Sequence, residues 1–178
     1  MKTIINSCAA VIMMTVVLHS GYINAQNKTL TDPEIASVAV TANQIDINYA
    51  KIAQERSKNA DVLKFANTMA TDHQSIIDQA VALVNKLGIT PMDNEVSQKL
   101  NANVEKTTTM LLSHTGTAFD IAYIDNEVTY HKAVIETVQN TLIPQCQNTE
   151  LKTLLEKVVP ILKTHLEHAE MVRTMLTK

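Results

Sequence analysis

The sequence contains few glycines and few aromatic residues. Only Gly21, Gly88 and Gly116 occur among 178 residues, and neither a G-x-G-x-x-G nor a G-x-x-x-x-G-K loop can be built from them. This excludes the common glycine-rich phosphate-binding loops. Tryptophan is absent, aromatic residues make up 3% of the chain and the formal net charge is −3. Nucleic-acid-binding proteins usually carry a basic face or stacking aromatics, so no nucleic-acid partner is expected.

Motifs of two common enzyme classes are also missing. The sequence has no G-x-S-x-G elbow and no C-x-x-C pair, so serine-hydrolase and thioredoxin-type activities lack their signatures. Hydrophobic residues nevertheless make up 46% of the chain, which is enough for the core of a single domain. The composition therefore favours one globular domain and leans against an enzyme.

The first 25 residues resemble a secretory signal peptide. Lys2 precedes an apolar run that extends to Leu18, and Ala25 provides a small residue for cleavage before Gln26. The alternative is an N-terminal membrane anchor, but a spanning helix needs about 20 apolar residues and this run is shorter. We therefore expect a signal peptide over 1–25 and a bundle domain over 26–178. The protein would be exported, periplasmic or outer-membrane-associated, without a transmembrane helix in the mature chain.

The remaining cysteine, Cys146, cannot form an internal disulfide in the mature chain. It lies in the segment LIPQCQNT, which we expect to be an exposed loop. Its thiol should then react with thiol reagents or link two chains into a dimer.

The rest of the sequence has the pattern of amphipathic helices. Thr31, Pro33 and Glu34 form a helix start, and Gly88 marks a helix end. The predicted helices cover 33–56, 60–87, 94–113, 117–141 and 150–178, with Thr149 as the cap of the last one and a kink at Pro160. These ranges predict an all-α, ferritin-like four-helix bundle in which 94–113 crosses from one end to the other. The alternative is an up-down bundle with a fifth helix packed outside.

Polar residues interrupt the apolar stripes of all four long helices near their midpoints. Helices of similar length bring their midpoints to one level, so these side chains should converge inside the bundle. Imidazole and carboxylate groups bind first-row transition metals, and bundle cores are common sites for them. The predicted ligands of one metal ion are His73, His131 and His165 with Asp46 or Glu127. The alternative is a buried hydrogen-bond network without metal.

The spacing of these residues bears on the type of metal. Carboxylate di-iron bundles carry Glu-x-x-His on two helices, whereas no Asp or Glu lies three residues before any of these histidines. A mononuclear site suits zinc, copper or iron(II). Five further residues are expected to support these ligands from outside or to lie at the rim of the site: His168, Asp72, Asp120, Tyr123 and Met69.

Three segments resemble one known family. They are FANTMATDH, GTAFDIAYIDNEVTYH and VPILKTHLEHAEM, beginning at Phe65, Gly116 and Val159. Together they are similar to an exported bacterial family with a ferritin-like fold, catalogued as domain of unknown function 4142 and often labelled as outer-membrane proteins. By this resemblance, the family's motif positions are Met69, Asp72, His73, Phe119, Asp120, Tyr123, His131, Pro160 and His165. The family often has Glu where this chain has Asp46, and seldom an acid at Glu127. The resemblance implies fold and export but no activity.

Three functions remain open at this level. The first is an exported protein that stores, buffers or senses a transition metal. The second is a metal-dependent redox enzyme that acts on oxygen or peroxide. The third is a metal-free structural or envelope-stress protein.

Overall fold

The computed structural model describes residues 29–178, and this part of the chain contains helices and no strands. The fold is therefore all-α, as predicted. The long helices are α1 (Asp32–Arg56), α2 (Ala60–Leu87), α3 (Glu95–Leu112), α4 (Gly116–Thr137) and α6 (Thr149–Leu176). The predicted signal peptide, including Cys8, lies outside the described residues.

Side-chain caps fix the beginnings of these helices. Thr31 and Glu34 form a capping box at the start of α1, with a proline in its first turn. Asn59 begins α2 by accepting hydrogen bonds from the backbone N–H groups of residues 61 and 62, and Gly88 ends it with a left-handed φ of 65°. The cap of α6 is Asn148 rather than the predicted Thr149, because its side chain accepts from the N–H groups of residues 150 and 151.

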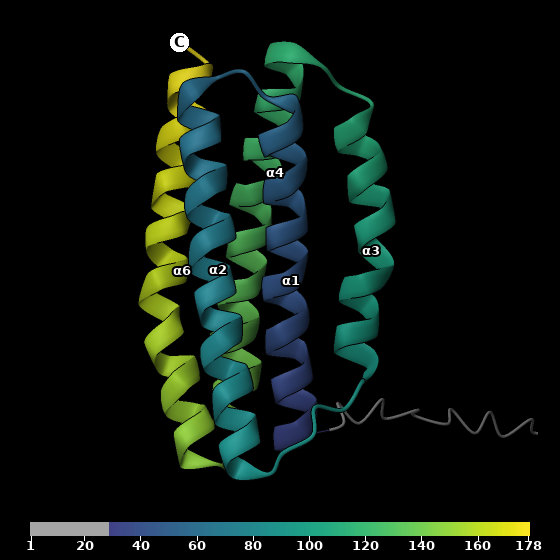
Figure 1. Ribbon diagram of the computed structural model, residues 1–178, viewed down its shortest axis with the longest axis vertical. Coiled ribbons are helices and arrows are strands. Elements are labelled where there is room, and N and C mark those ends of the chain that lie inside the picture. The colour runs from purple at the N-terminus through teal and green to yellow at the C-terminus, as the bar shows by residue number, and fades with distance from the viewer. Residues whose placement is uncertain (1–28) are drawn as a thin grey trace, which may run out of the picture.

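Four helices lie side by side and α3 lies outside them (Figure 1). α1 and α2 form an antiparallel pair, and so do α4 and α6. α3 runs from the end of the bundle where α2 finishes to the end where α4 begins (Figure 1). Consequently α2 and α4 run in the same direction. α3 contacts α1 more extensively than it contacts α4.

The connection between α4 and α6 is more helical than predicted. The chain continues from α4 through a π-helical turn, Val138–Leu142, and the short helix α5, Ile143–Gln145. Pro144 lacks an N–H group, and a wider turn can accommodate this within a continuing helix. Leu142 is 1% exposed in the apolar core, so its burial favours this course of the chain.

The exposure predicted for Cys146 is wrong, although the residue does lie in a short loop, in extended conformation directly after α5. The thiol is 3% exposed, and it packs in the same apolar cluster as Leu142 and Leu151. Its S–H group donates to the backbone oxygen of Asn148 at 3.4 Å. A thiol in this position is poorly placed to link two chains.

Within residues 29–178, no helix is both long and apolar enough to cross a membrane.

Candidate metal centre

Five buried polar side chains form a layer across the middle of the bundle. Two apolar clusters fill the two ends, and each of the four packed helices places a polar residue between them. On α2, for example, Met69 belongs to one cluster and Ile76 to the other, and His73 lies between them. We call this set the central polar layer; its members, each at most 2% exposed, are Asp46, His73, Glu127, His131 and His165.

The three imidazole rings of the layer face one another. Ring centroids lie 5.6 Å apart for His73 and His131, 5.1 Å for His73 and His165, and 5.6 Å for His131 and His165. One ring nitrogen from each histidine lies within 4.8 Å of the other two. The helical-wheel and midpoint argument therefore placed these three side chains together correctly.

Each imidazole is held from outside by one hydrogen-bond acceptor. His73 Nδ1 donates to Asn43 Oδ1 at 2.7 Å, and the Asn43 amide N–H donates in turn to the backbone oxygen of Ala39. His131 Nδ1 donates to the backbone oxygen of Glu127 at 3.0 Å. These acceptors place the proton on the outer nitrogen of each ring, so the inner nitrogen carries a lone pair.

His165 is held in the same way but with the opposite ring nitrogen. Its Nε2 donates to Asp72 Oδ2 at 2.9 Å. The Asp72 side chain is 44% exposed, so this contact lies near the protein surface. Nδ1 of His165 is then the nitrogen with the free lone pair.

The inner nitrogens are buried without hydrogen-bond partners among the described residues. They are His73 Nε2, His131 Nε2 and His165 Nδ1. Unpaired buried polar atoms are rare in proteins because each costs about 1–3 kcal/mol. The layer contains three such atoms, and the other nitrogen of each ring is hydrogen-bonded. Imidazoles that coordinate a metal are arranged in this way.

Asp46 supplies a fourth donor to this group. Its Oδ2 lies 3.5 Å from His73 Nε2 and 3.6 Å from His131 Nε2, and both of its carboxyl oxygens lack a hydrogen-bond partner among the described residues. Two donors each about 2.1 Å from a tetrahedral ion are about 3.4 Å apart. The observed separations are therefore close to those of a coordinated set.

Glu127 lies on the other side of His131. Its Oε2 is 3.7 Å from His131 Nδ1, and Asp46, Glu127 and His131 form a second group whose potential ligand atoms lie within 4.8 Å of one another. Because His131 Nδ1 already donates to a backbone oxygen, Glu127 is placed to support Asp46 and His131 rather than to replace either.

Burial determines the protonation of these groups. Loss of hydration lowers the pKa of His73 well below its usual value, and neighbouring His131 and His165 lower it further. The same burial lowers the pKa of His131 to about 4 and also lowers that of His165. It raises the pKa of Asp46 to about 8 and that of Glu127 well above its usual value. At neutral pH the imidazoles are consequently neutral and able to act as ligands.

The expected rim residues occupy different places. Asp72 supports His165 as described above. His168 packs edge-to-face on Phe65, with ring centroids 5.1 Å apart, and takes no part in the layer. Met69 is fully buried in the apolar cluster around Phe65.

Asp120 and Tyr123 lie in the apolar end of the bundle near the α1–α2 turn. Asp120 Oδ1 accepts a hydrogen bond from Ser57 Oγ at 2.6 Å, which ties α4 to that turn. Tyr123 is fully buried, and its ring is parallel to that of Phe119. Neither residue belongs to either metal-ligand group.

Asn43 is the one side chain of the site that the sequence analysis missed. It lies three residues before Asp46, one turn earlier on the same face of α1. It is 8% exposed, and most of the other buried residues of α1 are alanine and isoleucine. A second buried polar residue at this spacing was the available signal.

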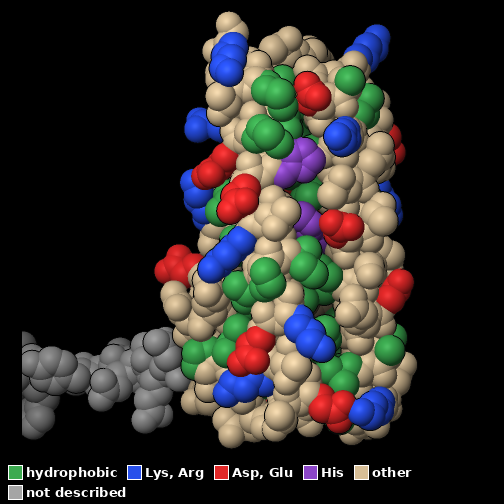
Figure 2. All heavy atoms as spheres, turned by 90° about the vertical axis from the view of Figure 1, so that its left-hand side faces the viewer, with side chains coloured by type: hydrophobic (Ala, Val, Ile, Leu, Met, Phe, Trp, Pro, Cys, Tyr) green, Lys and Arg blue, Asp and Glu red, His purple; other side chains and the backbone are tan. Residues whose placement is uncertain are grey.

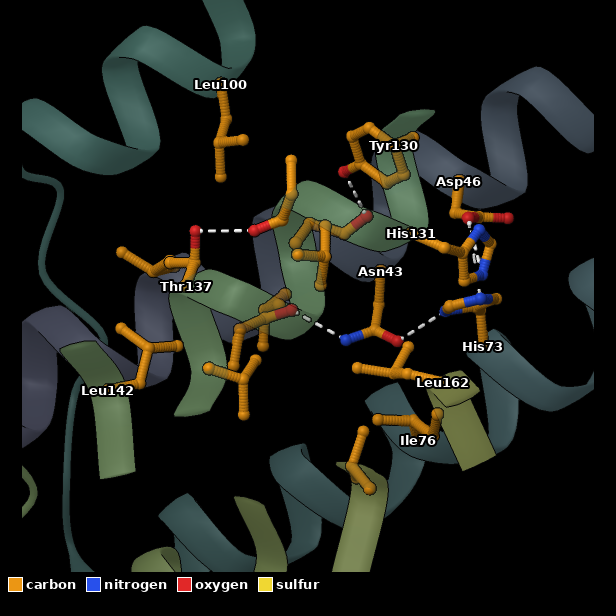
Figure 3. A pocket seen from close by; sticks show the side chains of 18 of the residues that line it. Asn43, Asp46, His73, Ile76, Leu100, Tyr130, His131, Thr137, Leu142 and Leu162 are labelled. Atoms are coloured by element: carbon orange, nitrogen blue, oxygen red, sulfur yellow. Dashed lines mark hydrogen bonds and ion pairs between the residues drawn. The ribbon is translucent and has the colours of Figure 1, made fainter. Parts of the chain in front are cut away.

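The buried layer lies between one face of the molecule and an apolar cavity. On the face formed by α2 and α6, histidine side chains are visible at the surface beside acidic ones (Figure 2). On the other side, an apolar cavity of about 450 Å³ is lined by Asp46, His73 and His131 (Figure 3).

Comparisons with known proteins identify a family but no relative of known function. A family model described as Domain of unknown function (DUF4142) matches residues 21–172. No curated protein and no solved structure matches the chain.

Proposed function

We propose that this chain, which belongs to the family described as Domain of unknown function (DUF4142), binds one divalent transition-metal ion in the central polar layer. The observation that carries the proposal is the orientation of the three imidazoles. Each donates its outer N–H to a fixed acceptor and directs an unpaired, buried nitrogen toward the other two. Metal-ligating histidines are oriented by outer acceptors in this manner.

His73, His131 and His165 would provide three nitrogen ligands, and Asp46 a carboxylate. Glu127 would compensate charge or accept a hydrogen bond beside Asp46. Nitrogen and carboxylate donors suit Zn²⁺, Fe²⁺ and Cu²⁺. No cysteine belongs to either potential ligand group in the described chain, so a soft sulfur-rich site of the kind that favours Cu⁺ is not indicated. The role would be storage, buffering or sensing of the metal.

Metal analysis of purified protein tests this proposal. The protein is prepared without a histidine tag, equilibrated with Zn²⁺, Fe²⁺ or Cu²⁺, and separated from free ions before elemental analysis. We expect close to one tightly bound ion per chain for at least one of these metals. Absence of bound metal in all three cases would contradict the proposal.

Histidine substitutions test the ligand assignment. His73→Ala and His165→Ala should each abolish stoichiometric binding, because each removes one of three converging nitrogens. His168→Ala is the matched control, since His168 lies on α6 one turn from His165 but packs on Phe65. Equal loss of metal in His168→Ala would contradict the assignment.

A second candidate function is a redox enzyme acting on oxygen or peroxide. The cavity that borders Asp46, His73 and His131 favours it, because a small molecule could reach an open coordination position from there. Peroxide and oxygen consumption by metal-loaded protein, compared with His73→Ala, tests this candidate. Equal rates in the two proteins would exclude it.

A metal-free structural or envelope-stress role is less well supported. A satisfied polar network would pair the buried atoms of the layer, whereas seven buried side-chain atoms of the described chain, six of them in this layer, lack partners. The metal analysis above also separates this role from the other two.

We also propose that the chain is exported and that its helices have ferritin-like topology. Export rests on the pattern of residues 1–25 and predicts a mature N-terminus near Gln26; an intact mass that includes residues 1–25 would contradict it. The topology rests on the passage of α3 from one end of the bundle to the other (Figure 1). An experimental structure with α2 and α4 antiparallel would contradict it.

A further inference from the structure

The apolar cavity beside the central polar layer is large enough for an organic ligand. Its volume is about 450 Å³, within the range of about 300–1,000 Å³ of typical ligand pockets. Apart from the imidazoles of His73 and His131, its aromatic lining residues are Tyr49 and Tyr130, and most of the others are Ala, Val, Leu and Ile. This lining suits an aliphatic chain better than a planar ring system.

Polar lining residues gather toward one end of the cavity. α3 contributes Asn103, Lys106 and Thr107 from its middle part, and α4 contributes Asn126 and Thr129 from its middle part. This end of the cavity is the one at the central polar layer, since Asn126 and Thr129 flank Glu127 in the sequence and three members of that layer also line the cavity. One end of the cavity is therefore able to bind a polar head group.

The opposite end of the cavity is apolar except for Thr137. Val96 and Leu100 come from the N-terminal half of α3, Leu142 from the segment after α4, and Leu151 and Leu155 from the beginning of α6. Leu142, Leu151 and Leu155 are at most 4% exposed. Figure 3 shows Leu142 and Thr137 at this end of the cavity, with Leu162 and Ile76 nearer to His73. The cavity thus has a polar end and an apolar end, which match the head group and the hydrocarbon chain of an amphiphile.

Lys106 determines the charge at the polar end. It is the only lysine or arginine that lines the cavity in the described part of the chain, and it is exposed. The only carboxylate in the lining is Asp46, in the central polar layer. Asn103 and Lys106 on α3 and Thr129 and Ala133 on α4 are exposed residues of the lining, so the cavity opens to solvent between these two helices. A cation at an otherwise uncharged mouth complements an anionic head group.

We propose that this cavity binds a long-chain aliphatic carboxylate, with its hydrocarbon chain along the apolar half and its carboxylate at Lys106. The ligand would be a free fatty acid rather than a planar cofactor, a peptide or a second copy of the chain. The assignment does not depend on the metal, because the carboxylate lies at the mouth and not at the imidazoles.

Direct binding of hexadecanoate tests the proposal. The purified full chain is titrated by calorimetry with hexadecanoate, octanoate and acetate, below the concentration at which the acids form micelles. Affinity should increase steeply with chain length, because each buried methylene raises the affinity about fourfold. Hexadecan-1-ol, which has the same chain and no charge, should bind more weakly than hexadecanoate.

Two lysine variants of α3 locate the head group. Lys106→Met should weaken hexadecanoate binding about fivefold, as expected for loss of one partly solvated charge pair, and should leave hexadecan-1-ol unaffected. Lys99→Met is the matched control, because Lys99 is also exposed on α3 but does not line the cavity. Both positions are exposed, so neither variant removes a buried contact.

Several outcomes would overturn the proposal. One is no saturable binding of hexadecanoate to wild-type protein; another is equal binding of acetate and hexadecanoate. Unchanged hexadecanoate affinity in Lys106→Met would overturn the placement of the carboxylate. A concentration-dependent dimer that hexadecanoate fails to dissociate would identify a second copy as the occupant instead. Each titration is run with chelator-treated and Zn²⁺-treated protein, so failure to bind metal and failure to bind fatty acid are separate results.

Discussion

At the scale of single residues, the distinguishing feature of this protein is the pairing of outer acceptors with inner unpaired nitrogens. Asn43, the backbone oxygen of Glu127 and Asp72 each occupy one nitrogen of one imidazole. The acceptors come from three different helices. The tautomer of each histidine is thus a property of the folded chain, and it is what would make the rings ready to receive a cation without rearrangement.

Asn43 gives the sharpest residue-scale prediction. Asn43→Ala should lower metal affinity by about 10- to 100-fold, because the Nδ1–H of His73 loses its acceptor and the ring loses its orientation. Competition with a chromophoric chelator measures the change. Asn48→Ala is the control, since Asn48 is an exposed asparagine on the same helix whose amide oxygen accepts a hydrogen bond from exposed Gln44. Equal affinities for wild type and Asn43→Ala would show that the ring needs no outer acceptor.

The same layer predicts how stability without metal depends on pH. Below about pH 6.5 the unfolded histidines take up protons that buried His73, His131 and His165 do not bind, so stability is lost as pH falls. Above that pH, Asp46 keeps its proton up to about pH 8 in the folded state, while an unfolded aspartate has already lost it near 3.8. Stability is therefore also lost as pH rises toward 8, and the maximum should lie near pH 6.5.

Denaturant unfolding in the presence of a chelator, at a series of pH values, measures this profile. Asp46→Asn should reduce the loss between pH 6.5 and 8, because its amide does not titrate. With saturating metal, the stability that the protein gains from metal binding should instead increase from pH 6.5 to pH 8, since the ion favours the ionised carboxylate. A flat profile between pH 6.5 and 8 in chelator-treated wild type would contradict the protonation assigned to Asp46.

At the scale of elements, the connection from α4 to α6 departs most from expectation. Leu142 and Cys146 both belong to the apolar cluster that packs against the first turns of α6. The helical segment 138–145 carries Leu142 inside, and Cys146, the first residue after it, is extended and also buried. The burial of Leu142 favours the helical course of this segment despite Pro144.

This burial makes Cys146 unreactive in the folded protein. Burial away from water is the main reason why the pKa of its thiol rises from 9.0 to about 11. This rise lowers the fraction of thiolate at pH 8 roughly 100-fold. Reaction with a coloured disulfide reagent should be correspondingly slow, and electrophoresis without reductant should show no linked dimer. The same protein unfolded in guanidinium chloride should react at an ordinary rate. Rapid labelling of the folded protein would contradict the buried position.

At the scale of the whole molecule, α3 differs from the other long helices. Only Ser97 and Leu111 are buried on it, compared with twelve residues on α1. Its amphipathic face covers one side of the bundle but adds little to the core. Stability should therefore be unevenly distributed, with α3 as the least protected long helix.

Amide hydrogen exchange measures this distribution. The amides of α3 should exchange before those of α1, α2, α4 and α6, because opening α3 exposes less apolar surface than opening any of the others. The α2 amides around His73 serve as the internal reference, since that residue is 2% exposed. Equal protection of α3 and α2 would show that α3 unfolds only with the entire bundle.

Much of the architecture was determined by the sequence alone. Thr31, Asn59, Gly88 and Asn94 act through local hydrogen bonds or local backbone conformation, so helix ends at these residues can be located from neighbouring residues. The apolar stripes have a period close to that of the helix, and they placed Asp46, His73, Glu127, His131 and His165 on inward faces. Their equal height followed from helix lengths, which are also readable from the sequence.

The tertiary structure decided what depends on contacts between helices. Which nitrogen of each imidazole faces inward depends on Asn43, on a backbone oxygen and on Asp72, and hydrogen bonds between helices are not encoded in the pattern of any one helix. The inward course of Leu142 and Cys146 and the cavity beneath α3 depend on packing volumes, which the order of apolar and polar residues does not specify. The sequence thus determined which side chains point inward. The distances between these side chains, their protonation and their access to solvent depend on how the five helices pack together, because burial and hydrogen bonding are properties of the assembled interior.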